Sequence, residues 1–184
     1  MSTLDDLFSE AILEAYASAP TKEPVLGTLE LRHPAFLDEE GEPLTAVRLV
    51  LDNRDWDLKL NADAPADPGD LVEFRGVPID VKLPEHSDTG VPEAEIGIDN
   101  ASAELMPQFK RAGDTNDPIF VTYREFLPSR RFFGPEFIID GFSAKRARAT
   151  VLRATARLGF FDMLNAAFPS ETYRVEDYRG LAQR

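Results

Sequence analysis

The sequence predicts a mainly β protein, a sandwich or barrel-like sheet with an N-terminal amphipathic helix and one or two short helices. In several short runs apolar residues alternate with polar ones, which is the period of a strand with one buried face. Segments rich in Asp, Gly, Pro and Asn separate these runs. Many short strands joined by such turns are typical of sandwiches and barrels.

The first segment departs from the strand pattern. Its apolar side chains are spaced three and four residues apart, as on one face of a helix: Leu4, Leu7, Phe8, Ala11, Ile12, Ala15 and Tyr16. Thr3 is suited to cap this helix, and Pro20 to end it. We therefore expect a helix within residues 1–20, followed by a single β-rich domain over residues 21–184.

The expected strands follow in order along the chain. They cover residues 25–31, 47–51, 56–60, 72–74, 79–83 and 94–98, with Gly76 marking a bulge or turn between the fourth and fifth. Residues 101–112 predict a short helix capped by Asp99 or Asn100. Strands resume at residues 119–123 and 137–142, and the longest candidate runs from about Lys145 to Leu158. Residues 160–169 predict a last short helix.

Composition limits the function classes. The chain has 184 residues, of which 43% are hydrophobic, enough for a core without a disulfide or metal. It has no cysteine, which excludes thiolate metal sites and cysteine nucleophiles. Neither a secretory signal nor an apolar run long enough to span a bilayer is expected. The sequence therefore predicts neither membrane insertion nor a thiol-dependent activity.

The net charge of −13 is unevenly distributed. Residues 1–100 carry 23 acidic and 7 basic side chains, a net charge of −16, whereas residues 101–184 carry 10 acidic and 13 basic ones, a net charge of +3. An acidic half repels phosphate backbones, so sequence-specific nucleic-acid binding is not expected. A solvated acidic face and head-to-tail contact between unlike surfaces both fit this division.

No common catalytic or metal-binding pattern occurs. His33 precedes Pro34 at an expected strand end, and the neighbours His86, Ser87 and Asp88 are better explained by a turn than by a triad, whose members must converge in space. Two acidic clusters lack the spacing of a calcium loop: Asp38, Glu39, Glu40 and Glu42, and Asp52, Asp55 and Asp57. A glycosidase-type carboxylate pair stays open, because its separation is a three-dimensional quantity. We expect no catalytic residues, no cofactor and no metal.

Two groups of residues are candidates for an interface. The segment SRRFFG places two arginines beside two phenylalanines in a predicted loop, at Arg130, Arg131, Phe132 and Phe133. Arginine and aromatic residues are enriched in interface cores. Arg153 and Arg157 share one face of the longest predicted strand, where a subunit boundary and a solvated edge are both possible.

Four stretches resemble a family of phage and prophage tail proteins classed as a domain of unknown function. They are LGTLELRHPAF, GVPIDVKLPEHSDTGVPEAEIGIDN, PIFVTYREFL and ARLGFFDMLNAAFPSETYRVEDYRGL, and the resemblance covers roughly residues 5–181. The pattern also looks like a distant, shortened relative of lambda minor tail protein L. That protein ends in a cysteine-rich segment, which this chain lacks.

The resemblance implies a tail-hub type β domain in the virion tail, assembled in the bacterial cytoplasm. Its expected role is structural: part of a ring or collar at the tail tip, beside the distal tail or hub proteins and other copies of itself. A trimer and a hexamer are both open, as is the possibility that the acidic half faces the tail lumen. The alternatives are a receptor- or carbohydrate-binding β-sandwich of the tail tip and a cell-wall hydrolase.

Overall fold

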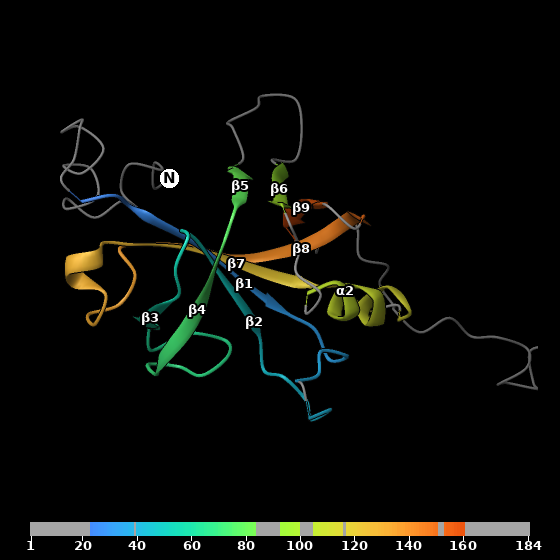
Figure 1. Ribbon diagram of the computed structural model, residues 1–184, viewed down its shortest axis with the longest axis horizontal. Coiled ribbons are helices and arrows are strands. Elements are labelled where there is room, and N and C mark those ends of the chain that lie inside the picture. Colours follow the sequence, from blue (N-terminus) through green and yellow to red (C-terminus); the bar gives the residue numbers. More distant parts are fainter. Residues whose placement is uncertain are drawn as a thin grey trace, which may run out of the picture.

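The computed structural model describes residues 23–38, 40–83, 93–99, 105–115, 117–150 and 153–160. Within these ranges the protein is mainly β, as the sequence predicts, with nine strands in one mixed sheet and one helix packed against it (Figure 1). The helices expected within residues 1–20 and after residue 160 lie outside the described residues, as does the sequence His86-Ser87-Asp88.

The elements follow one another along the chain with short connections. They are β1 (Leu26–Arg32), β2 (Val47–Leu51), β3 (Trp56–Lys59), β4 (Leu71–Val77), β5 (Ile79–Lys82), β6 (Glu93–Asp99), α2 (Leu105–Gly113), β7 (Phe120–Phe126), the single-turn helix η2 (Pro128–Arg130), β8 (Phe137–Ala149) and β9 (Arg153–Phe160).

The strand pairing closes on itself to form a barrel. The order in the sheet is β3-β4-β2-β1-β7-β8-β9-β6-β5. Only Pro78 separates β4 from β5, and its carbonyl accepts the amide of Asp99 in β6 at 3.0 Å. One bent strand therefore pairs with β2 before the bend and with β6 after it, which closes the barrel and leaves β3, paired with β4, at the end of the order. A proline fits this bend because it has no amide to contribute to a ladder.

Alternation along the strands fills the barrel interior. In β1, Leu29 and Leu31 point inward and are almost fully buried, as are Leu49 in β2 and Val121 in β7. The inward residues of β6 and β9 meet them from the other side of the barrel. Burying these side chains supplies the main stabilisation of the fold.

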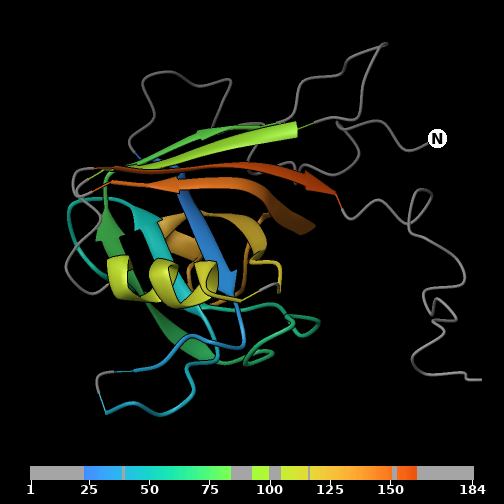
Figure 2. The ribbon, with the colours of Figure 1, turned by 90° about the vertical axis from the view of Figure 1, so that its right-hand side faces the viewer.

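The helix α2 covers one end of the barrel (Figure 2). Leu105 and Ala112 on its buried face belong to the same core cluster as the inward residues of the strands. Gln108 fixes the helix to the segment before β2, because its side-chain oxygen accepts the amide of Leu37 at 3.0 Å and its amide donates to the carbonyl of the same residue. Asp99, one of the expected caps, ends β6, and residues 100–104 lie outside the described ones.

A second, smaller core lies on the outer face of the barrel. The hairpin of β3 and β4 and the connection between them pack over β1, β2 and β7. The buried members of this second core are Leu26, Val50, Trp56, Leu58, Leu60, Ala64, Phe74 and Phe126. The face of β1, β2 and β7 that points away from the barrel is consequently buried as well.

Two sequence predictions were wrong. The residues from Lys145 to Leu158 do not form one strand: the first part continues the strand expected at residues 137–142, giving β8, and the second part belongs to β9. The two strands form a hairpin, and after the end of β8 the hydroxyl of Thr150 accepts the amide of Arg153 at 3.1 Å. Gly76 marks neither a bulge nor a turn, since it lies inside β4 and the break comes at Pro78. Gly76 is needed for space: a Cβ placed there would lie within 2.7 Å of three backbone atoms of Arg54.

We predict that Gly76→Ala destabilises the fold by about 1–3 kcal/mol, because the added methyl group forces the Arg54 backbone to move. Gly113→Ala, at the end of α2, is the matched control, since its Cβ would meet nothing within 4 Å. Urea unfolding followed by circular dichroism measures both variants. Equal stability of the two variants would contradict the close approach.

Candidate functional site

Glu30 is fully buried on the outer face of β1. Its side chain has 0% relative exposure, although it alternates with the inward residues Leu29 and Leu31. The antiparallel register places Arg48 of β2 on one side of it and Thr122 of β7 on the other. Side chains directly opposite each other on neighbouring strands are in contact distance.

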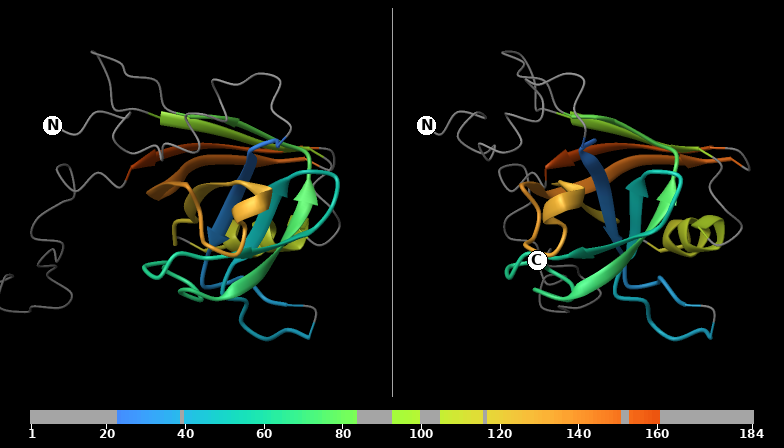
Figure 3. Two further views of the ribbon diagram at one scale, coloured as in Figure 1. Left: turned by 90° about the vertical axis from the view of Figure 1, so that its left-hand side faces the viewer. Right: turned by 60° about the vertical axis from the view of Figure 1, so that its left-hand side comes forward.

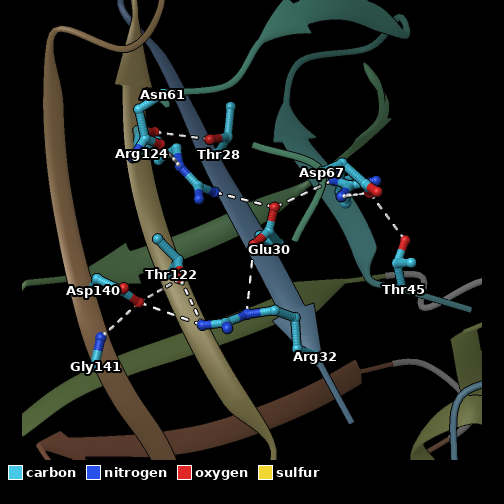
Figure 4. Close-up of polar contacts among 11 residues, drawn as sticks. Thr28, Glu30, Arg32, Thr45, Asn61, Asp67, Thr122, Arg124, Asp140 and Gly141 are labelled. Atoms are coloured by element: carbon cyan, nitrogen blue, oxygen red, sulfur yellow. Dashed lines mark hydrogen bonds and ion pairs between the residues drawn. The ribbon is translucent and has the colours of Figure 1, made fainter. Parts of the chain in front are cut away.

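Three arginines surround the Glu30 carboxylate (Figure 4). Arg32 Nε lies 3.5 Å from Oε1, and Arg48 Nε and Arg124 Nη1 each lie 3.3 Å from Oε2. Arg124 is itself only 1% exposed. Burial lowers the pKa of Arg124, and the negative charge of Glu30 opposes that effect. The opposite charges of a buried guanidinium and a buried carboxylate attract each other and offset part of the cost of removing each from water.

Two aspartates complete the charge balance. Asp140 accepts hydrogen bonds from the Thr122 hydroxyl and the Gly141 amide at 2.7 Å each, and lies 3.4 Å from Arg32. Gly141, at φ +81°, forms a bulge in β8 that turns Asp140 toward this group. Asp67 accepts hydrogen bonds from Arg48 and from Thr45. We call these six residues, Glu30, Arg32, Arg48, Asp67, Arg124 and Asp140, the Glu30 cluster; it holds three positive and three negative groups.

The Glu30 cluster anchors the connection between β3 and β4. Arg124 Nε donates to the side-chain oxygen of Asn61 at 3.2 Å, and Asp67, at φ +49°, binds Arg48 from the same connection. Asn61 lies two residues after the end of β3 at Lys59, and the Lys59 amide donates to the carbonyl of Arg131 at 2.9 Å. The cluster is thereby linked through β3 to the connection between β7 and β8.

That connection holds the segment that we call the Arg–Phe loop, Arg130–Phe133. Backbone hydrogen bonds of 2.9 Å fix it internally, from Arg130 to Leu127 and from Phe133 to Arg130, while Arg130 forms a 3.1 Å ion pair with Glu136. Figure 3 shows the connection, in gold, on the side of the barrel that faces the viewer in the left panel. The loop therefore has a defined conformation within the described part of the chain.

The Arg–Phe loop exposes two aromatic rings. Phe133 is 81% exposed and Phe132 is 51% exposed, so Phe133 is the most exposed large hydrophobic side chain among the described residues. The guanidinium of Arg131 lies over the ring of Phe132, 4.6 Å from its centroid. An ordered loop that holds aromatic rings and arginines in water has the composition of an interface core.

Trp56, beside the loop, is covered. It is 8% exposed, its indole nitrogen donates to Asp52 at 2.7 Å, and the guanidinium of Arg54 lies 4.0 Å from the ring centroid. Arg131 approaches the same ring at 5.6 Å. The hydrogen bond from Trp56 is the main reason why the pKa of Asp52 is lowered.

Arg153 and Arg157 lie elsewhere, on the outer face of β9, apart from the Arg–Phe loop. Arg153 is bound to Asp99 at 3.0 Å and to Asp80 at 3.4 Å, and Arg157 lies 3.6 Å from Glu95. Both side chains stay exposed, but each already faces a carboxylate of β5 or β6. The structure thus brings four of the six predicted interface residues together and places the other two in a solvated charge ladder.

The remaining sequence candidates have structural partners. His33 accepts the amide of Ala35 at Nδ1, 3.0 Å away, and its Nε2 lies 3.2 Å from the carbonyl of Asp117, which assigns the proton to Nε2. Asp55 accepts the amide of Gly76 at 2.8 Å. Asp57 is exposed on β3. Among the described residues, no group of three His, Asp or Glu side chains could hold a metal ion.

The fold and the site define a small β-barrel protein with a preformed aromatic and arginine loop on its surface. The chain belongs to the family described as a domain of unknown function, DUF1833, whose sequence profile matches residues 11–173. No curated protein matches the chain. In the described part of the chain, no helix is long and apolar enough to cross a membrane.

We predict that Asp67 stabilises the fold at neutral pH and that this contribution is lost in acid. Hydrogen bonding to Arg48 is the main cause of its lowered pKa, starting from an ordinary value of 3.8. The stabilisation is therefore complete above that value and disappears as the pH falls through the folded-state pKa. The free-energy difference between wild type and Asp67→Asn should shrink from pH 7 to about pH 2 in urea titrations.

Asparagine suits this test because it tolerates the positive φ of residue 67. Asp63→Asn removes a carboxylate from the same connection, where residue 63 is exposed, and serves as the control. A pH-independent difference for Asp67→Asn would contradict the assigned role of its charge.

We also predict that Glu30→Gln destabilises the protein by about 3–5 kcal/mol, because it leaves Arg124 charged and buried without its counter-charge. The double variant Glu30→Met with Arg124→Met removes both buried charges and should be less destabilised than Glu30→Gln alone. A double-mutant cycle in urea measures the coupling. Strictly additive effects would show that the two charges do not interact.

Proposed function

We propose that this chain is a structural component of a phage tail tip, where it forms part of a ring or collar beside the distal tail or hub proteins. The single observation that carries the proposal is the Arg–Phe loop, which is fixed by hydrogen bonds and yet exposes Phe133 and Phe132. The resemblance to phage and prophage tail proteins supplies the assembly to which that loop belongs.

Exposed aromatic rings on an ordered loop favour assembly over catalysis. An aromatic side chain gains free energy when a partner removes it from water. An ordered loop also loses little conformational entropy on binding, so more of the contact energy contributes to affinity. Because the loop is held by β3 and by Glu136, it presents the same surface before and after assembly.

The carbohydrate-binding alternative receives less support. Sugar rings stack on open aromatic faces, whereas the guanidinium of Arg54 lies over the ring of Trp56, which is almost fully buried. The two exposed rings of the loop are flanked by arginines rather than by the acidic and amide groups that accept sugar hydroxyls. A protein surface is the partner that this composition suits better.

We predict that gold-labelled antibody against the chain binds the distal end of purified phage tails, and that the double variant Phe132→Ser and Phe133→Ser is absent from the tails although it folds. Both rings are solvent-exposed, so the Tm of the isolated variant should stay close to that of wild type. Immunoelectron microscopy and blotting of purified particles measure incorporation.

Leu51→Ser is the matched control, since Leu51 is also 50% exposed but lies outside the Arg–Phe loop. Its incorporation should equal that of wild type. Intact tails without any label, produced in a lysate that contains abundant protein, would refute the proposed function. Normal incorporation of the Phe132→Ser and Phe133→Ser double variant would show that the Arg–Phe loop is not needed for assembly into the tail.

A further inference from the structure

A groove runs along α2 at the other end of the molecule. It lies between the helix, β2, β4 and the hairpin before β2, and has a volume of about 430 Å³. Apolar side chains form most of its wall, among them Leu37, Leu44, Leu49, Leu105 and Pro107. We call this the α2 groove. Its walls are held together, because Gln108 of the helix binds Leu37, and the Leu44 amide donates to Phe36 at 2.9 Å.

The groove and the Arg–Phe loop lie at opposite ends of the barrel. Figure 1 places the gold β7–β8 connection at the left end of the long axis and α2 at the right. A protrusion at one end and a hollow at the other cannot meet within one chain. They can meet between two copies placed head to tail, which is a heterologous contact.

The two surfaces match in size and in chemistry. A cavity of about 150 Å³ already holds benzene, so the groove has room for the ring of Phe133 and for part of Phe132. Both rings are exposed to water in the single chain, and the apolar wall of the groove would remove them from it. Two rigid surfaces need little rearrangement in order to dock.

The charges at the edges are also of opposite sign. Asp38 and Glu73 line the groove, and Glu40 and Glu42 are exposed in the adjoining hairpin. Arg131 forms no ion pair with any residue in the described ranges and would approach these carboxylates. Three arginines also line the groove: Arg48 is bound to Glu30 and Asp67, Arg111 donates to Gln108, and Arg75 lies on β4. Because Arg48 is paired with acidic groups, the carboxylates of Asp38, Glu40, Glu42 and Glu73 outnumber the other two arginines at this edge. Opposite potentials of this kind orient partners and set the register.

We infer that the Arg–Phe loop of one copy docks into the α2 groove of a second copy, so that copies of this chain associate head to tail. Phe133 is the central anchor, and Arg131 faces the carboxylates at the edge. The inference rests on the proposed function and deepens it by naming the contact between neighbouring copies in the ring. A heterologous contact of this type closes into a ring when its rotation permits and otherwise continues as a filament.

Cysteine cross-linking tests the contact directly, because the full chain has no cysteine of its own. The double variant Phe132→Cys with Leu44→Cys keeps Phe133 as the anchor and, oxidised at high protein concentration, should form a ladder of disulfide-linked oligomers on non-reducing gels. A mixture of the two single variants should give covalent dimers that contain one of each. Pro107→Cys in place of Leu44→Cys repeats the test on the helix side of the groove.

Phe132→Cys with Lys82→Cys is the control, since Lys82 is exposed on β5 and does not line the groove. This pair should give no ladder. Disulfide dimers of Phe132→Cys alone would indicate a symmetric loop-to-loop contact and would overturn the inference, as would the absence of cross-links for both groove positions. Gold label at the tail tip without a ladder of cross-linked oligomers would refute the head-to-tail contact but not the proposed function. A ladder without gold label on the tails would refute the proposed function but not the contact.

Discussion

The buried ionic contact between Glu30 and Arg124 is the constraint on which the outer layer of this protein depends. Both groups lie on a strand face that points away from the barrel, and both are fully buried. Neither charge tolerates that position without the other, so β1, β7 and the β3–β4 connection must keep their relative positions. Through Asn61 and Lys59 the same contact positions the Arg–Phe loop. The Arg–Phe loop is thus attached to the barrel through β3.

Much of the fold follows from the sequence, because period-two alternation records which strand faces are buried. The strand expected over residues 25–31 is confirmed as β1 for that reason, with Leu29 and Leu31 buried. The same rule failed at the hairpin of β8 and β9, since alternation continues across a tight turn without a break in period, and only Thr150 marks the turn. Closure of the barrel through Pro78 could not be predicted either. It depends on which strands pair, and local pattern carries no such information.

The site was predictable in part. The Arg–Phe loop was visible as a compact run of arginine and aromatic residues, which needs no partner strand to be recognised. The Glu30 cluster was missed because Thr28, Glu30 and Arg32 alternate with apolar residues, as the solvated face of a strand also does. The available signal was that β7 repeats the pattern with Thr122 and Arg124, so that two strands offer complementary charges on one face. Pairing of these strands is what turns that signal into a buried cluster.

The Arg–Phe loop keeps its conformation in the isolated chain. Hydrogen–deuterium exchange tests it at three amides that close the loop: Lys59, which donates to Arg131, Phe133, which donates to Arg130, and Glu136, which donates to Glu125. Their exchange in the isolated protein should be slow and comparable to that of amides within β1 and β7, because all of them depend on the same cooperative unit. Exchange of these three amides at the rate of an unstructured peptide, with β1 and β7 protected, would show that the loop becomes ordered only on binding and would contradict the account.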